Sequence, residues 1–306
     1  MTTYLDPVVL ENATPPPRVG PRAAAARPSR CAGASERARR SPITHLRYAA
    51  LATEDLRAAT AFYDGIWGLY RVAGDIDVVF LGTVGSPEPY VTRLRAAAER
   101  RTDLIAFGPV DAPAADALAQ RLDSDGVRLA AEPGRLQLPG SGYGFRFFGP
   151  NGRLVEVSCD VAGKPFRELE AGESVPRKPS HVVVSSPDVQ ALKAFCTKYL
   201  GLRLSDWLQN LCASCAARPT TTASRSRTAR SPTSTTCRSN CATSTSTCLA
   251  PEARATGHRP LLGPGRHSSG ANVYSYLAGP DGFVVEYTTA PEPSLCRARR
   301  YPPAAS

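Results

Sequence analysis

The chain carries the same pattern of residues twice, and this internal repeat is the feature that most limits its fold. Each copy opens with a short run containing a His, continues with an Asp and a Phe, and ends at a Gly-Leu pair. The matching residues are Thr44-His45-Leu46-Arg47-Tyr48, Asp55-Leu56, Phe62-Tyr63 and Gly68-Leu69 in the first copy, and Ser180-His181-Val182-Val183-Val184, Asp188-Val189, Phe195-Cys196 and Gly201-Leu202 in the second. Apolar residues at helical spacing after the Asp predict a strand followed by a helix in both copies.

Both copies also end alike, with two apolar runs joined by a turn. The residues are Phe145-Arg146-Phe147-Phe148, Gly149-Pro150-Asn151-Gly152 and Leu154-Val155-Glu156-Val157 in the first copy, and Tyr274-Ser275-Tyr276-Leu277, Gly279-Pro280-Asp281-Gly282 and Val284-Val285-Glu286-Tyr287 in the second. Gly supplies the positive φ that such a turn needs, so each tail is predicted to be a β-hairpin. Matching heads and tails about 130 residues apart predict two related modules; two unrelated α+β domains are the alternative.

This order of elements resembles the βαβββ unit of the vicinal oxygen chelate superfamily, which includes glyoxalases, bleomycin-resistance proteins and extradiol dioxygenases. The resemblance covers residues 43 to about 211 and 255 to 290. It implies an α+β fold in which tandem βαβββ modules form a cupped mixed sheet, with a metal inside the cup. Within the superfamily, the chain is most similar to the two-module extradiol ring-cleavage dioxygenases.

The repeat and the composition together divide the chain into segments. We expect a disordered leader at 1–41, a structural module at 42–160, a linker at 161–178, a metal-binding module at 179–290 and a disordered tail at 291–306.

The resemblance also implies a metal site in the second module. Extradiol dioxygenases hold Fe(II) through two His and one Glu, and His181 and Glu286 match the first and last of these ligands. A single polar residue in an apolar strand faces a cavity or a buried partner, so a hydrogen-bonded core histidine is the alternative for His181. The matching first-module residues are His45 and Glu156, but the central strand 104–107 offers no His, so that half is expected to be structural.

Two further residues match the pocket of these enzymes. A Gly-Arg-His segment, here Gly265-Arg266-His267, precedes Tyr276, which lies ten residues before Glu286. The resemblance implies that His267 and Tyr276 line the substrate pocket as catalytic residues, with the Tyr hydrogen-bonding a catecholate oxygen. A surface loop and a half-buried strand tyrosine are the structural alternative.

Residues 212–248 interrupt this match. They consist only of Ala, Cys, Asn, Pro, Arg, Ser and Thr, although the module needs two core strands and a helix here. Such a composition cannot bury a strand face. The second metal-binding His of the family, expected on the central strand, has no evident counterpart.

The genetic code suggests a cause for this composition. If the last base of each codon is read with the first two bases of the next, Ser234-Thr235-Thr236-Cys237 permits Asn-His-Val, and residues 219–224 permit Asp-His-His-Ser-Ile. In the family, a His-His pair supplies the acid-base His and an Asn-His-Val strand supplies the second ligand. We therefore interpret 209–254 as frameshifted; a disordered insertion is the alternative.

The net charge of +10 does not indicate a nucleic-acid partner. The leader, the 212–248 segment and the tail after Cys296 hold 15 basic and 3 acidic residues, and without them 22 basic and 24 acidic residues remain. No run of 18 apolar residues predicts a membrane span. No secretory signal is evident and disulfides have little support, so we expect a cytoplasmic protein.

The sequence therefore favours an Fe(II)-dependent dioxygenase, with Mn(II) as the alternative metal, acting on a catechol-like aromatic diol and O2. The damaged segment leaves open whether the chain as written is active. The alternatives are a glyoxalase-like isomerase or lyase of the same fold, and a non-catalytic binding protein. Related enzymes often assemble, so a homo-oligomer is also left open.

Overall fold

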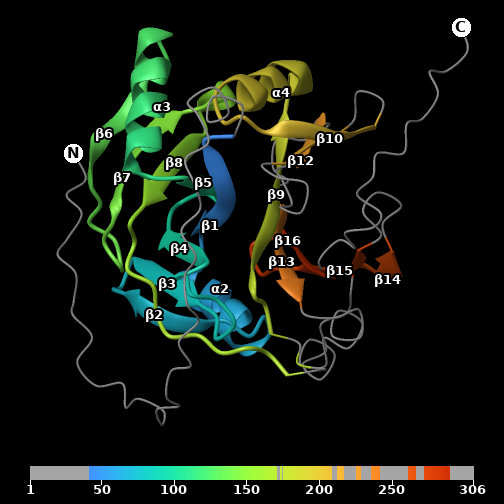
Figure 1. Cartoon of the computed structure of the whole chain (residues 1–306). Helices are drawn as coiled ribbons and strands as arrows, with labels where there is room; N and C mark the ends of the chain where they lie inside the picture. Colours follow the sequence, from blue (N-terminus) through green and yellow to red (C-terminus); the bar gives the residue numbers. More distant parts are fainter. Residues whose placement is uncertain are drawn as a thin grey trace, which may run out of the picture.

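Two halves of similar architecture lie side by side in the computed structural model (Figure 1). The structure describes residues 41–170, 173, 175–208, 212–216, 225–228, 236–241, 261–266 and 272–289. The elements of the N-terminal half run from Ile43 to Cys159, and those of the C-terminal half from Lys178 to Thr289. The described residues between them contain no helix or strand.

The N-terminal half is built on one mixed sheet of eight strands, in the order β2-β3-β4-β1-β5-β8-β7-β6. The strands are β1 (Ile43–Thr53), β2 (Tyr70–Gly74), β3 (Val78–Gly82), β4 (Thr92–Ala96), β5 (Arg101–Pro109), β6 (Leu129–Arg135), β7 (Tyr143–Phe148) and β8 (Leu154–Cys159). The central strand β5 is antiparallel to β1 and parallel to β8.

The C-terminal half repeats this sheet, in the order β10-β11-β12-β9-β13-β16-β15-β14. Its strands are β9 (Lys178–Ser186), β10 (Arg203–Leu208), β11 (Cys212–Ala216), β12 (Arg225–Thr228), β13 (Thr236–Cys241), β14 (Leu262–Arg266), β15 (Val273–Ala278) and β16 (Val284–Thr289). Each strand holds the place of its N-terminal counterpart, so the predicted repeat is a repeat of whole sheets.

The α+β fold expected from the sequence is confirmed, and the structure adds that the N-terminal half contains two βαβββ units. In this half, α2 (Leu56–Gly65) follows β1 and α3 (Ala112–Ser124) follows β5. In the C-terminal half, α4 (Val189–Lys198) follows β9 and completes one unit, while β13 to β16 take the strand places of a second unit and residues 242–260 lie outside the described residues. The expectation that a single pair of units makes one cupped sheet is therefore refined, since two units make the N-terminal sheet alone.

An Asp caps each of the three described helices, and α2 and α4 begin where the sequence predicts. The carboxylates of Asp55, Asp111 and Asp188 accept hydrogen bonds from backbone N–H groups three residues on, at 2.8–2.9 Å. Such caps satisfy N–H groups that the helix itself leaves without acceptors.

The predicted hairpin turns are also present. Gly152 has φ of 70° between β7 and β8, and Gly282 has φ of 69° between β15 and β16. This left-handed backbone region favours Gly because a Cβ would be crowded there. Each turn places its Glu four residues on, at a matching position of the strand that follows.

Apolar packing joins the halves. Residues of both contribute to one buried cluster, in which Trp67, just after α2, contacts Tyr287 on β16 with ring centroids 3.9 Å apart. The Tyr287 hydroxyl donates a hydrogen bond to the Trp67 carbonyl at 2.6 Å. Phe195 on α4 packs in turn against Phe147 on β7, at 6.1 Å between centroids.

Several expectations lie outside the described residues. These are nearly all of the leader, the tail, and parts of the 209–254 segment. The structure does describe β11, β12 and β13 within that segment, and their backbones pair with neighbouring strands. The reading frame of the segment stays a prediction. No helix in the described part of the chain is long and apolar enough to span a bilayer.

Trp67→Ala is expected to lower the free energy of unfolding by about 3–5 kcal/mol, because it removes a buried indole from the contact between the halves. Urea denaturation followed by circular dichroism measures the change. Ile76→Ala is the control, since Ile76 is 88% exposed and its loss should change stability by less than about 0.5 kcal/mol. Equal effects of the two substitutions would contradict the assignment of Trp67 to this interface.

Candidate metal centre

One row of paired residues crosses four neighbouring strands of the C-terminal sheet. His181 on β9 pairs with position 238 on β13, which pairs in turn with Glu286 on β16. Glu286 also pairs with Tyr276 on β15. Residues directly opposite each other on adjacent strands point to the same face of the sheet. The row therefore brings together three of the four residues predicted for the site.

The two predicted metal ligands are adjacent and buried. His181 Nε2 lies 4.0 Å from Glu286 Oε2, and their side chains are 2% and 0% exposed. The other ring nitrogen of His181, Nδ1, shares a hydrogen bond of 2.8 Å with the Ser180 hydroxyl. In metal sites, a hydrogen bond to the ring nitrogen that does not bind the metal orients the imidazole. His181 and Glu286 therefore have the chemistry of two ligands of a divalent cation.

The third ligand of the predicted triad is not found among the described residues. Among the described residues, no group of three His, Cys, Asp or Glu side chains could hold a metal ion. The register position between His181 and Glu286 is occupied by Arg238, and a guanidinium has no lone pair to offer a metal. The donor set described here is therefore incomplete for a facial triad. His267 lies outside the described residues.

The N-terminal sheet has the same row with different residues. Tyr48, Ala106, Glu156 and Arg146 pair in sequence across β1, β5, β8 and β7. The alignment of the two repeat copies in the sequence matched His45 to His181. This match is wrong, because Tyr48 holds the position equivalent to His181. The helix caps could have shown it, since Tyr48 precedes Asp55 by seven residues, as His181 precedes Asp188.

A guanidinium neutralises the buried carboxylate of this N-terminal row. Arg146 donates to Glu156 Oε2 through Nε at 2.9 Å and lies within 2.8 Å through Nη2. The Ser158 hydroxyl donates to the other carboxylate oxygen at 2.9 Å. Both carboxylate oxygens of Glu156 therefore accept hydrogen bonds from protein groups, so this side chain is poorly suited to bind a metal.

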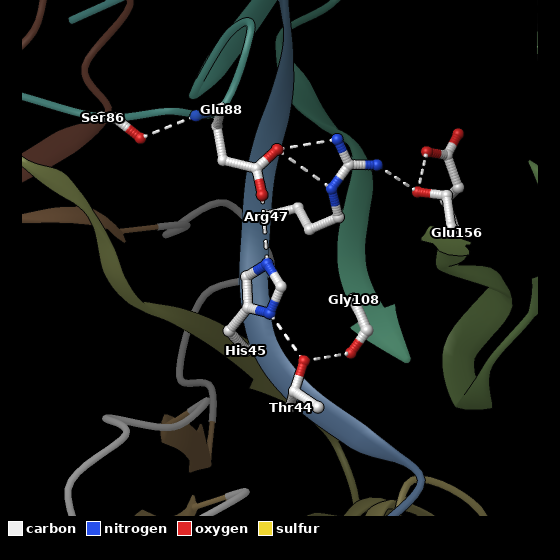
Figure 2. Close-up of polar contacts among 8 residues, drawn as sticks. Thr44, His45, Arg47, Ser86, Glu88, Gly108 and Glu156 are labelled. Atoms are coloured by element: carbon white, nitrogen blue, oxygen red, sulfur yellow. Dashed lines mark hydrogen bonds and ion pairs between the residues drawn. The ribbon is translucent and has the colours of Figure 1, made fainter. Parts of the chain in front are cut away.

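Figure 2 shows how this network continues to the start of β1. Arg47 donates to Ser158 at 2.6 Å and to Glu88 at 2.7 Å, and Glu88 also contacts His45 Nε2 at 3.1 Å. Burial alone would raise the pKa of Glu88, but hydrogen bonds from His45 and Arg47 outweigh it and lower the pKa below its ordinary value. His45 is therefore a partner in an ion-pair network at the start of β1.

Packed side chains occupy the same face of the N-terminal sheet. Tyr48 lies edge-on to Tyr90 at 4.7 Å between centroids, and Phe80 lies edge-on to Tyr90 at 4.8 Å. These rings belong to a buried cluster with residues of β5 and of the loop before β7. The packing supports a structural role for this half.

Comparison with known proteins places this architecture in a family. A glyoxalase of Novosphingobium aromaticivorans, solved with Mn(II) bound, is 35% identical, with a TM-score of 0.77 over 82% of this chain and 84% of the relative. Homoprotocatechuate 2,3-dioxygenase of Arthrobacter globiformis is 19% identical, with a TM-score of 0.72 over 82% and 81%. The 2,3-dioxygenase LapB of Pseudomonas sp. KL28 is 16% identical, with a TM-score of 0.70 over 82% and 94%. At these two lower identities the likeness shows the fold alone.

Among curated proteins, metapyrocatechase 2 of Cupriavidus necator is 27% identical over 193 residues. The match covers 56% of this chain and 59% of that relative, less than two thirds of its length. No family model matches the chain.

Paired βαβββ units with a buried His-carboxylate pair are typical of metal-dependent enzymes that act on small molecules. The chain belongs to the vicinal oxygen chelate superfamily, which contains the glyoxalases and the extradiol dioxygenases.

Arg146→Met is expected to cost about 3 kcal/mol of stability, because it leaves the fully buried Glu156 without its ion-pair partner. Adding Glu156→Gln should restore part of this loss, since the double variant no longer buries a lone charge. Urea denaturation of both variants measures the effects. Arg167→Met, in an exposed ion pair, is the control and should cause no measurable change. A double variant less stable than Arg146→Met would contradict the role given to Arg146.

Proposed function

We propose that the C-terminal half carries the metal site of an extradiol-type, Fe(II)-dependent dioxygenase that acts on a catechol-like aromatic diol. The adjacency of His181 and Glu286 in a buried row, beside Tyr276, is the observation that carries this proposal. Mn(II) is the alternative metal, since a 35% identical relative was solved with it.

The residues of the row would divide the work. His181 and Glu286 would hold the metal, and the Ser180 hydroxyl would keep the imidazole in orientation. When bound, Fe(II) supplies a Lewis-acidic, redox-active centre at which a vicinal diol can be chelated. Tyr276, directly opposite Glu286, would hydrogen-bond a phenolic oxygen of the substrate. His267 is proposed to line the substrate pocket at this metal centre.

The row also gives a reason why the chain as written would turn over poorly. Two protein ligands hold Fe(II) less well than three, and the position between them holds an Arg. We propose that β13 is part of the frameshifted segment 209–254, and that its correct reading supplies the missing His. Under this proposal the described sheet is a dioxygenase scaffold with one ligand strand altered.

A glyoxalase-like isomerase is the second candidate function. It is favoured by the higher identity to the glyoxalase than to the 2,3-dioxygenases, 35% against 16–19%. Both reactions use a substrate with two neighbouring oxygens, so the row alone does not separate them.

His181→Ala is expected to reduce the iron retained by the purified protein by at least about tenfold, since it removes one of two described ligands. Metal content after loading with Fe(II) and with Mn(II), by mass spectrometry, measures the change. His45→Ala is the matched control, because that His lies outside the row, and it should leave metal content unchanged. Equal metal retention by all three proteins would overturn the site.

Oxygen uptake with catechol, compared with isomerisation of a glutathione hemithioacetal, separates the two functions. Dioxygenase chemistry predicts oxygen uptake and no isomerisation, and the reverse result would favour the glyoxalase. A loaded protein inert in both assays would favour a non-catalytic binding protein.

Resequencing the DNA that encodes residues 208–256 tests the frameshift. An insertion or deletion on each side of the segment is expected. The chain translated in the restored frame should retain more iron than the chain as written, because β13 then carries a His. An intact reading frame across the segment would end the frameshift proposal.

A further inference from the structure

The two halves contact each other through two equivalent zones. In one, α2 and the residues after it pack against the turn between β15 and β16, where Phe62 lies 3.9 Å from the Cβ position of Gly279. In the other, α4 packs against the turn between β7 and β8, where Phe195 lies 4.0 Å from the Cβ position of Gly149. Phe62 and Phe195 match in the repeat, as do Gly149 and Gly279. The repeat therefore predicts the same packing in both zones.

Aromatic side chains fill the first zone. Tyr63, Trp67 and Phe283 are between 2% and 4% exposed and belong to the buried cluster that joins the halves. Trp67 stacks on Phe62 at 6.2 Å between centroids and packs on Tyr287. The protein's own rings therefore occupy this zone.

The second zone has smaller or charged residues at the same three positions. Cys196 stands where the first zone has Tyr63, Leu200 where it has Trp67, and Arg153 where it has Phe283. A pocket with a cavity volume of about 50 Å³ opens here. Its walls are almost entirely apolar and come from β5, β8, β9, α4 and the β7–β8 turn. The space corresponds to aromatic groups that the other zone contains and this one lacks.

This pocket lies on the opposite face of the sheets from the metal row. Val184 lines it and is three residues from His181 on β9, and Val155 lines it next to Glu156 on β8. Successive strand residues point to opposite faces, so neither row faces the pocket. A ligand held here would be distinct from a substrate at the candidate metal centre.

Two cationic residues, Arg153 and Lys193, line the pocket, and Arg153 has a buried guanidinium nitrogen. Its Nη2 donates to the Ser185 carbonyl, but its Nε is buried and has no hydrogen-bond partner in the described part of the chain. No carboxylate among the described residues forms a salt bridge with it. Burial lowers the pKa of Arg153, as expected for a guanidinium that loses water without gaining a counter-ion. A buried charge of this kind is stabilised by an anion.

We propose that this pocket binds a small aromatic carboxylate, with a single ring among the apolar side chains and the carboxylate on Arg153. The ring takes the place that Tyr63 and Trp67 fill in the equivalent zone, and a guanidinium matches the geometry of a carboxylate. Because the walls come from both halves, the ligand stabilises the docking of α4 on the N-terminal sheet.

Isothermal titration of the whole chain with benzoate, benzyl alcohol and benzylamine tests the proposal. These probes share one ring and differ in charge. Benzoate is expected to bind at least about tenfold more tightly than benzyl alcohol, because only it pairs with Arg153, and benzylamine should bind weakest. Equal binding of all three would overturn the assignment of the carboxylate to Arg153.

Variants locate the binding. Arg153→Met should reduce benzoate affinity about tenfold, to the level of benzyl alcohol. Leu200→Trp, which copies the filled zone, should abolish binding of both. Should Leu200→Trp fail to fold, as judged by circular dichroism, Cys196→Phe replaces it with the same expectation. Arg135→Met, exposed on β6, is the matched control and should bind benzoate as the parent does.

A further variant tests whether benzoate binds at the candidate metal centre instead of in this pocket. His181→Ala should leave benzoate affinity unchanged, whatever becomes of its metal content. Benzoate binding that survives Leu200→Trp and Cys196→Phe but is lost in His181→Ala would overturn the pocket and place the ligand at the metal centre instead.

Discussion

Both sheets bury a carboxylate at the same place, and the character of each half follows from how that charge is compensated. Glu156 and Glu286 are each 0% exposed. An uncompensated carboxylate at such depth costs several kcal/mol, so a neighbouring group has to offset it. The N-terminal sheet supplies Arg146, whereas the C-terminal sheet supplies His181 and places Tyr276 at the position of Arg146. One row is thereby a closed ion pair and the other a candidate metal centre.

The same divergence of equivalent positions occurs where the halves meet. Trp67 and Tyr287 fill one contact zone, while Leu200 and Arg153 leave the other partly open. A repeated backbone thus provides four comparable places, two in the rows and two in the contact zones. In each pair of places, one is filled by the protein's own side chains. The other is the candidate metal centre in the case of the rows, and the proposed ligand pocket in the case of the contact zones.

Much of the fold could be predicted from local signals. The Asp caps, the Gly residues with positive φ and the two hairpin turns depend on residues within a few positions of one another, and the structure has them where the sequence indicates. The number of βαβββ units could not be predicted as readily. The unit that contains α3 carries the tail motif of the repeat in β7 and β8, but its opening strand β5 and its helix carry no copy of the head motif, so the sequence did not mark where this unit begins.

The sequence by itself determined the repeat, the helices α2 and α4, the turns and the candidates His181, Tyr276 and Glu286, because each depends on patterns along the chain. Only the tertiary structure decided which residues share a row. The pairing of Tyr48 with Ala106 joins strands distant in sequence, and a displaced register would have exchanged their neighbours. It also decided that Arg153 faces a pocket between the halves, since packing across the interface leaves no signal in either half alone.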